Sequence, residues 1–273
     1  MIRVDKFYLI LDELIESNYF FNLLEGFDSV LPLHTDISLT WKINETVCSG
    51  ACYGIQYIAQ TNTISTKQMF FSQKDETYFL YPEAEDYSKI CLTYDGTFRE
   101  DVALELFMVG FYSYMSQKQT LLMHASAVEY EGQGIVFTAA SGVGKTTQAE
   151  LWAKYKNAKI LNGDKVFLKQ EKDGIHAWGS PWKGSSHYAR NESAKLRAIV
   201  VLEQAEENSI QKLNVLESMQ YFVQHIFFPC WDEVCEHAVL TFLDKVLEET
   251  EVYLLKCRPD EDAVELLATT LKE

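Results

Sequence analysis

A short loop of small residues constrains this chain more than any other segment. The loop runs Ala139-Ala140-Ser141-Gly142-Val143-Gly144-Lys145-Thr146-Thr147. The apolar run before it, residues 134–138, predicts a buried strand, and residues 146–155 after it carry apolar side chains at helical spacing. A strand, a glycine loop and a helix in this order bring free backbone N–H groups and a helix N-terminus to one spot. Phosphate groups bind to such an arrangement.

The loop therefore predicts a nucleotide-binding site of the P-loop (Walker A) type. Lys145 is expected to bridge the outer phosphates of a nucleoside triphosphate, and the Thr146 hydroxyl to hold Mg²⁺. Ala139 departs from the pattern, which has glycine at this position. A plain glycine turn that caps a helix is the alternative interpretation. The expected nucleotide-binding residues are Ala140, Ser141, Gly142, Val143, Gly144, Lys145, Thr146 and Thr147.

A carboxylate follows the next predicted strand, residues 159–161. Asp164 stands nineteen residues after Lys145. A carboxylate at the C-terminal end of a neighbouring strand suits a ligand of Mg²⁺, or of its water, in a P-loop protein. Asn162-Gly163-Asp164 is also a sequence that forms plain turns. The spacing from Lys145 favours the metal-binding interpretation.

His124 lies on a predicted strand, residues 121–130, immediately before the strand of the phosphate loop. Alternation places it on one face with Leu122 and Ser126. A lone histidine in a strand is more often a hydrogen-bonded core residue than a ligand, so periodicity alone assigns it no role.

Residues 179–190 form a polar loop that is too irregular for a helix or a strand. It places an aromatic side chain, a cation and several hydroxyls between two glycines. Such loops bind substrate or fold over a site, although a surface connection is the alternative. The predicted substrate-contacting residues are Pro181, Trp182, Lys183, Gly184, Ser185, Ser186 and Arg190. The later aromatic side chains at 221, 222, 227 and 228 are expected in the core.

The hydrophobic period changes near residue 97, which predicts two domains. Residues 1–97 alternate in short runs typical of strands, and a helical piece near Ile10 to Leu24 is expected before them. We expect a mainly antiparallel β-rich domain of unknown role there, followed by an α/β domain (α+β overall) over 98–273 that carries the P-loop. The expected strands of the first domain are residues 38–43, 53–58, 68–72, 77–81 and 89–94.

The composition of the chain argues against several classes of binding partner. The formal net charge of −16 opposes nucleic acid and an acidic membrane surface. No apolar run approaches the about 20 residues that span a bilayer, and the first residues lack a secretory signal, so a cytoplasmic protein is expected. The six cysteines follow no recognised zinc or disulfide spacing and predict reduced thiols. A metal site at Cys48, Cys52 and Cys91 is the alternative.

Residues from about 121 to 186 resemble the catalytic domain of the HPr serine kinase/phosphorylase family, whose fold is shared with phosphoenolpyruvate carboxykinases. The similar elements, in chain order, are Met123-His124, Ser141-Gly142-Val143-Gly144-Lys145, Asp164-Lys165 and the loop Gly179 to Gly184 with Pro181-Trp182. That last loop is similar to one in HPr-kinase-like proteins that phosphorylate serines of peptides. The first 97 residues do not resemble the usual N-terminal domain of the family.

The resemblance implies an ATP-dependent, Mg²⁺-dependent kinase that transfers the γ-phosphoryl group to a serine of a small protein or peptide. It implies catalytic roles for Lys145, Asp164 and His124, and Mg²⁺ binding by Thr146 and Asp164. Asp164 would be the metal ligand or the base for the serine hydroxyl. The resemblance leaves open whether the donor is ATP or another nucleotide, and whether the chain forms a homo-oligomer.

One departure keeps other functions open. The family has two adjacent aspartates on this strand, and the first is Gly163 here. Either Asp164 does both jobs, or Asn162 helps to position the acceptor, or the protein binds nucleotide without efficient transfer. The alternatives to a serine kinase are a nucleotide-binding regulatory or assembly protein and a small-molecule kinase or carboxykinase-like enzyme.

Overall fold

The computed structural model describes residues 2–4, 7–12, 37–43, 69–73, 76–82, 84–95 and 100–272. The chain divides into two compact units. The first consists of Met1–Gln117 with Pro229–Ala238, and the second of Lys118–Phe228 with Val239–Glu273. The change of hydrophobic period places a domain boundary near residue 97, whereas the compact units part after residue 117.

The first unit contains a mixed sheet in the order β1-β2-β3-β6-β5-β4. The strands are β1 (Ile2–Val4), β2 (Phe7–Asp12), β3 (Ile37–Ile43), β4 (Met69–Gln73), β5 (Glu76–Pro82) and β6 (Lys89–Asp95). β3 pairs in parallel with β2 and β6, while the other pairings are antiparallel. A mainly antiparallel sheet was expected, and three of the five pairings are antiparallel. The two parallel pairings of β3 were not predicted, because alternation identifies strands without giving the direction of their neighbours.

The expected helix near residues 10–24 is wrong at its start, because Ile10 to Asp12 belong to strand β2. The run of large apolar residues within 7–12 is too short for its hydrophobic period to distinguish a helix from a strand. Residues 13–24, the expected strand at 53–58, and Cys48 and Cys52 lie outside the described residues, as does the side chain of Cys91.

Helix α2 (Glu100–Ser116) and the returning stretch 229–238 complete the first unit. The Trp231 indole N–H donates to Ser113 Oγ at 2.9 Å, and the Tyr87 hydroxyl donates to Asp232 Oδ2 at 2.9 Å. Asp232 Oδ1 also accepts the backbone N–H of Val234 at 2.8 Å, at the start of helix α5 (Glu233–Glu249). Polar side-chain contacts thus fasten a distant stretch of sequence to this unit.

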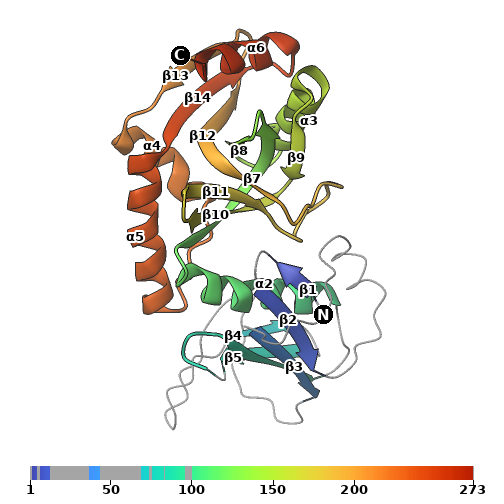
Figure 1. The fold of residues 1–273 in the computed structure, drawn as a ribbon. Coiled ribbons are helices and arrows are strands. Elements are labelled where there is room, and N and C mark those ends of the chain that lie inside the picture. The colour runs from blue at the N-terminus through green and yellow to red at the C-terminus, as the bar shows by residue number, and fades with distance from the viewer. Residues whose placement is uncertain are drawn as a thin grey trace. The chain divides into compact units, whose positions relative to one another are not determined.

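The second unit is built on a mixed eight-stranded sheet, which agrees with the expected α/β class (Figure 1). Its path is β11-β10-β7-β8-β12-β14-β13, β9 pairs with β7, and β11 also pairs with β12. The strands are β7 (Thr120–Tyr130), β8 (Gln133–Thr138), β9 (Lys159–Asn162), β10 (Lys165–Glu171), β11 (Gly174–Gly179), β12 (Ser193–Gln204), β13 (Ser209–Lys212) and β14 (Glu251–Cys257).

Three parallel strands, β8, β12 and β14, form the middle of this path. Their runs 134–138, 198–202 and 252–255 are buried without interruption, as is typical of parallel strands covered on both faces. Because the strands are parallel, their carboxyl ends meet at one edge of the sheet. The phosphate loop leaves β8 at this edge.

A core around Trp152 holds the helix that follows the loop. Trp152 belongs to α3 (Lys145–Lys156), is fully buried, and packs edge-on against Tyr130 with ring centroids 5.2 Å apart. Val264 and Leu267 of helix α6 (Glu261–Thr270) belong to the same core cluster. α3 and α6 therefore pack together beside the sheet (Figure 1). This packing fixes the direction in which the start of α3 points.

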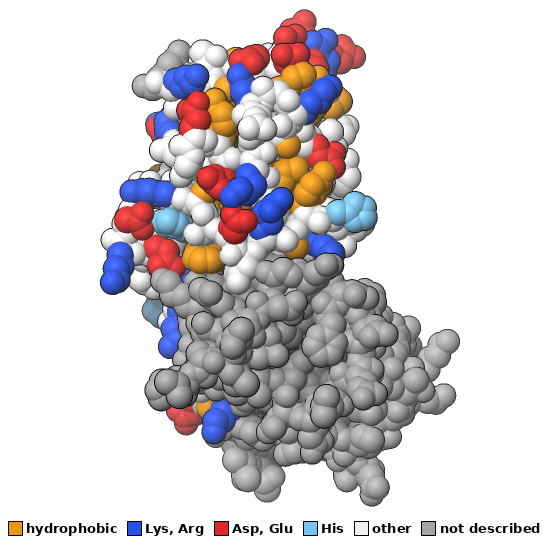
Figure 2. Space-filling model, turned by 45° about the vertical axis from the view of Figure 1, so that its right-hand side comes forward, with side chains coloured by type: hydrophobic (Ala, Val, Ile, Leu, Met, Phe, Trp, Pro, Cys, Tyr) orange, Lys and Arg blue, Asp and Glu red, His pale blue; other side chains and the backbone are white. Residues whose placement is uncertain are grey.

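The remaining helical segments are α4 (Val215–Phe222) and the short 3₁₀ turn η1 (Val223–His225). Asn214 and Glu217 form a capping box at the start of α4, which satisfies its first N–H groups. No helix among the described residues is long and apolar enough to cross a membrane. Acidic and basic side chains are interspersed over the coloured face in Figure 2.

Candidate functional site

The loop between β8 and α3 adopts a conformation that requires glycine at two positions. Gly142 has a φ of 79° and Gly144 a φ of 123°, both in the region that side chains disfavour. Ala139 is buried and is not among the residues with positive φ, so alanine fits where the pattern has glycine. Ser126 on β7 donates its hydroxyl to the carbonyl of Lys145 at 2.7 Å and fixes the first turn of α3.

Lys145 folds back into its own loop. Its side chain is buried, and Nζ donates to the carbonyls of Ala139 at 3.1 Å and Ala140 at 3.5 Å. Burial lowers the pKa of the Lys145 ammonium, and the charge of Asp164 opposes this shift. An anion in the loop would stabilise this buried ammonium, because charge-assisted hydrogen bonds are stronger than those to neutral carbonyls.

Asn162-Gly163-Asp164 is a turn, and it also delivers a carboxylate to the site. Asn162 Oδ1 accepts the backbone N–H groups of Asp164 at 2.7 Å and Lys165 at 2.9 Å. Its Nδ2 donates to the carbonyl of Ser180 at 2.7 Å, and the residue is fully buried. Asn162 therefore shapes the turn and is occupied by backbone groups.

The Asp164 carboxylate lies against two basic side chains. His124 Nε2 is 3.2 Å from Oδ1 and Lys165 Nζ is 3.5 Å from Oδ2. Burial alone would raise the pKa of Asp164, but the hydrogen bond from His124 and the charge of Lys165 outweigh it and leave the pKa below its ordinary value. His124 and Lys165 are register partners on β7 and β10, so the sheet itself places both groups beside the carboxylate. Asp164 is therefore ionised at neutral pH.

Thr146 and Asp164 together fit a magnesium ion shared with phosphate. Thr146 Oγ1 donates to the carbonyl of Gly163 at 2.9 Å, which brings the hydroxyl next to the turn that carries Asp164. Mg²⁺ prefers oxygen ligands and is usually held by one or two protein groups together with phosphate oxygens and water. A hydroxyl and a carboxylate supply that chemistry. Within the described ranges there is no cluster of three His, Cys, Asp or Glu side chains that could hold a metal by itself.

The loop 179–190 packs directly on this turn. A Cβ on Gly184 would lie 2.7 Å from Cγ of Asp164, and one on Gly163 would lie 2.6 Å from Cβ of Ser186 and closer still to its hydroxyl. The Ser186 hydroxyl itself donates to the carbonyl of Lys183 at 2.7 Å. Ser186 therefore fills the space that any side chain at position 163 would occupy.

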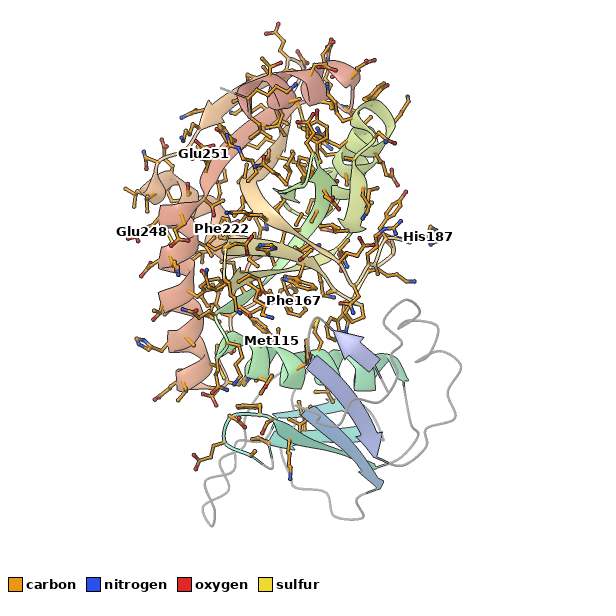
Figure 3. The ribbon with its side chains drawn as sticks, in the orientation of Figure 1. Met115, Phe167, His187, Phe222, Glu248 and Glu251 are labelled. Carbon is orange, nitrogen blue, oxygen red and sulfur yellow. The ribbon has the colours of Figure 1, made fainter. Side chains whose placement is uncertain are left out.

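Other residues of this loop anchor it. Pro181 and Trp182 are buried, and the Trp182 ring meets Phe167 at 6.3 Å in an edge-on contact. Arg190 donates from Nε to the carbonyl of Ile160 at 3.1 Å and its guanidinium lies 3.8 Å from Glu192. Ser185 is exposed, and His187 is exposed and points outward (Figure 3).

The structure thus brings together Lys145, Thr146, Asp164 and His124 with the 183–186 part of the loop. It directs Pro181 and Trp182 into the protein, and the Arg190 guanidinium towards Ile160 and Glu192.

The hydrophobic pattern of the sequence did not identify His225 as a candidate site residue. Ile226 forms a bridge with Met123, which places His225 beside His124. Burial lowers the pKa of His225, and the charges of Lys145 and His124 lower it further, so the imidazole lies within electrostatic reach of both. Lys165 Nζ also lies 5.9 Å from the ring centroid of Phe227, which is only partly buried although the core was expected. No spacing links residues 225–227 to the phosphate loop, because an isolated bridge between β7 and the segment after η1 brings them there.

The family model described as "SynChlorMet cassette protein ScmC" matches residues 97–238, just over half of the chain. The chain belongs to this ScmC family. The matched segment begins where the hydrophobic period changes, and it includes the phosphate loop, Asp164 and the loop 179–190.

A solved structure, that of the Hpr(Ser) kinase/phosphatase from Coxiella burnetii, is similar to this ScmC family member at 12% identity. The similarity covers 55% of this chain and 93% of that chain, with a TM-score of 0.31. No curated protein is significantly similar to the chain.

Proposed function

We propose that this ScmC family member binds a Mg²⁺–nucleoside triphosphate, with ATP as the first candidate, and transfers its γ-phosphoryl group to a serine hydroxyl. The observation that carries the proposal is the position of Asp164. The ionised Asp164 carboxylate belongs to the turn whose Gly163 carbonyl accepts a hydrogen bond from the Thr146 hydroxyl. Its charge also acts on Lys145, a buried lysine in a glycine loop at a helix N-terminus. These are the parts that phosphoryl transfer needs, since it depends on positioning and on stabilising negative charge.

Each residue takes a role that follows from its contacts. The loop amides and Lys145 bind the β- and γ-phosphates. Thr146 and Asp164 would hold Mg²⁺, which would supply further positive charge to the phosphates. The acceptor oxygen forms a bond to the γ-phosphorus as the bond to the β–γ bridging oxygen breaks, and ADP leaves. The hydroxyl proton passes to Asp164, whose hydrogen bond from His124 orients its carboxylate.

The acceptor is proposed to be a peptide or small protein. Two residues of the 179–190 loop next to the Asp164 turn are available for contact with the acceptor. They are the exposed Ser185 and the half-buried Lys183. Because the family is described as a cassette protein, we propose that the acceptor is encoded in the same cassette.

A second candidate function is nucleotide binding without efficient transfer. It is favoured by Ser186, which fills the space beside Gly163, where HPr-kinase-like proteins have their first aspartate. This alternative predicts tight binding of Mg²⁺–ATP and no phosphorylated product.

Lys145→Ala tests both candidates. In the full chain, we expect it to reduce ATP binding and transfer from [γ-³²P]ATP to cassette peptides by at least about 100-fold, the scale of removing a charge at a phosphate site. Lys154→Ala is the matched control, because Lys154 lies near the other end of the same helix, where its Nζ donates to the Tyr155 hydroxyl at 2.9 Å. Thermal unfolding checks that both variants fold.

Retained transfer in Lys145→Ala would overturn the proposal. Wild-type protein that binds ATP but phosphorylates no cassette product would favour the second candidate, and failure to bind any nucleotide would reject both.

A further inference from the structure

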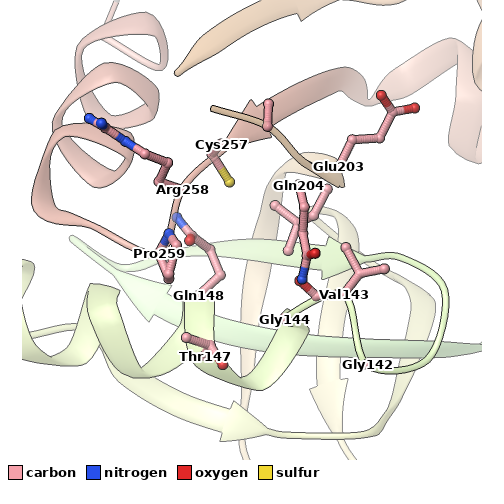
Figure 4. Close-up of a pocket in the computed structure, with 12 residues that line it drawn as sticks. Gly142, Val143, Gly144, Thr147, Gln148, Glu203, Gln204, Cys257, Arg258 and Pro259 are labelled. Atoms are coloured by element: carbon pink, nitrogen blue, oxygen red, sulfur yellow. The ribbon is translucent and has the colours of Figure 1, made fainter. Parts of the chain in front are cut away.

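A pocket of about 410 Å³ opens beside the phosphate loop, at the edge where the three parallel strands end (Figure 4). One wall is the loop itself and the start of α3. The other walls are the last residues of β12 and β14 and the residues directly after them. The lining consists of 142–144, 147, 148, 202–205 and 257–259. Pockets of this size accept small organic ligands, and none of these residues except those of the loop entered the expected site.

The pocket offers no unpaired charge. Arg258 Nε pairs with Asp260 Oδ2 at 2.9 Å, and Glu203 Oε2 pairs with Lys256 Nζ at 3.2 Å. Burial, with the charge of Asp260, raises the pKa of the Cys257 thiol to about 11, so the thiol is neutral at physiological pH. The other walls include Val143, Leu202 and Pro259. This surface suits an uncharged ring system better than a second anion.

One polar group in the wall lacks a partner. Gln148 is 3% exposed, and its Nε2 has no hydrogen-bond partner among the residues that the structure describes. Figure 4 shows its side chain extending from α3 towards Pro259. Buried polar side chains almost always have a partner, so an unpaired amide at a pocket indicates a ligand with a hydrogen-bond acceptor.

The pocket is continuous with the predicted phosphate site. Thr147 and Gln148 follow Lys145 and Thr146 directly on the first turn of α3, and Gly142 to Gly144 line both. Gln204 Nε2 donates to the carbonyl of Val143 at 3.2 Å, which ties the end of β12 to the loop. A molecule whose phosphates occupy the helix N-terminus therefore has its uncharged end within reach of this pocket.

We propose that the pocket holds the base and ribose of the nucleotide, and that the Gln148 amide donates a hydrogen bond to an acceptor atom of the base. This rests on the proposed function, because it assumes that the loop binds the phosphates. Leu202, Ala205 and Pro259 then supply the apolar contact with the base.

Photolabelling of the wild-type chain tests the position directly. With Mg²⁺ and 8-azido-ATP, labelled peptides are expected to contain residues 202–205 or 257–259. Labels confined to residues 179–190 or 223–228 would place the base on the Asp164 side of the loop and would overturn the assignment.

Gln148→Leu tests the hydrogen bond, with tripolyphosphate as the probe that has no base. We expect the variant to bind Mg²⁺–ATP about tenfold more weakly, the effect of losing one hydrogen bond, with unchanged affinity for Mg²⁺–tripolyphosphate. Gln133→Leu is the matched control, because Gln133 is exposed at the opposite end of β8.

The outcomes separate this inference from the proposed function. A wild-type chain that binds neither ligand fails the proposed function itself. A chain that binds both ligands equally well, or whose Gln148→Leu variant keeps its preference for ATP, overturns the base pocket alone. If Gln148→Leu does not fold, the photolabelling decides.

Discussion

Gly144 and Gly179, one in each loop of the candidate site, are glycines for opposite reasons. In the phosphate loop, Gly144 has a φ of 123°, while the nearest atom to an added Cβ is 3.9 Å away. Along the loop 179–190, Gly179 has no positive φ, but an added Cβ would lie 2.7 Å from the carbonyl oxygen of Leu161 and closer still to that of Arg190. Gly144 therefore provides backbone freedom, whereas Gly179 provides the absence of a side chain.

This contrast separates local from tertiary control. A strained φ is a property of the residue itself, so no change in a neighbour relieves it. A steric conflict involves two residues. Where the second one contributes a side chain, a substitution that shortens this side chain relieves the conflict. The following substitutions test this difference, in order of expected loss of unfolding free energy.

Gly179→Ala should have the largest effect. Its Cβ would run into backbone carbonyls of two segments, so the loop and β9 must separate, at a cost of about 3 kcal/mol or more. Urea unfolding measures the loss. Gly134→Ala is the control, because its added Cβ would also face a backbone oxygen, but at 3.1 Å, which is farther than either oxygen near Gly179. If both variants lose the same stability, close packing is not what Gly179 provides.

Gly163→Ala should lose about 2 kcal/mol, because Ser186 must move away from the new methyl group. Ser186→Gly removes the obstructing side chain. We expect the double variant to be more stable than Gly163→Ala alone, a coupling that a double-mutant cycle measures. Strictly additive effects would contradict the pairing.

Gly144→Ala should lose about 1 kcal/mol from its φ and should lose nucleotide binding as well. The reason is that the loop amides and Lys145 no longer converge on one spot. Gly132→Ala, at a φ of 78° with open space around it, should lose similar stability without affecting binding. Calorimetric titration with Mg²⁺–ATP separates the two, and full affinity in Gly144→Ala would show that the loop conformation is not needed.

His124→Gln should have the smallest effect, below about 1 kcal/mol. The pKa of Asp164 is depressed in the fold, so its contribution to stability is present above the pKa of about 3.9 for an unfolded aspartate and is lost as pH falls through the folded value. Without His124, the pKa of Asp164 should rise towards that ordinary value.

A carboxyl ¹³C NMR titration measures this rise, and urea unfolding at pH 6 and near pH 2 should show a difference from wild type only at the higher pH. His187→Gln, an exposed histidine, is the control. An unchanged Asp164 titration in His124→Gln would contradict the role of this hydrogen bond.

Much of the second unit follows from local patterns. The strand at 134–138, the glycine loop and the helix after it are confirmed in the expected order, and so are the strands that carry His124 and precede Asp164. β13 was missed because its short sequence, Ser209–Lys212, is polar and largely exposed, so it carries no buried alternation. The roles assigned to the site residues stay predictions.

The sequence by itself determined the conformation of the loop between β8 and α3. This conformation needs a strand before the loop, two glycines that tolerate a positive φ and a helix after it, and all of these are adjacent in the chain. Only the tertiary structure decided what surrounds it. The pairing of β7 with β10 sets His124 and Lys165 against Asp164, the bridge between Met123 and Ile226 brings in His225, and parallel strand ends enclose the Gln148 pocket. These neighbours are far apart in the chain, and the sheet that joins them has no signature in any single segment.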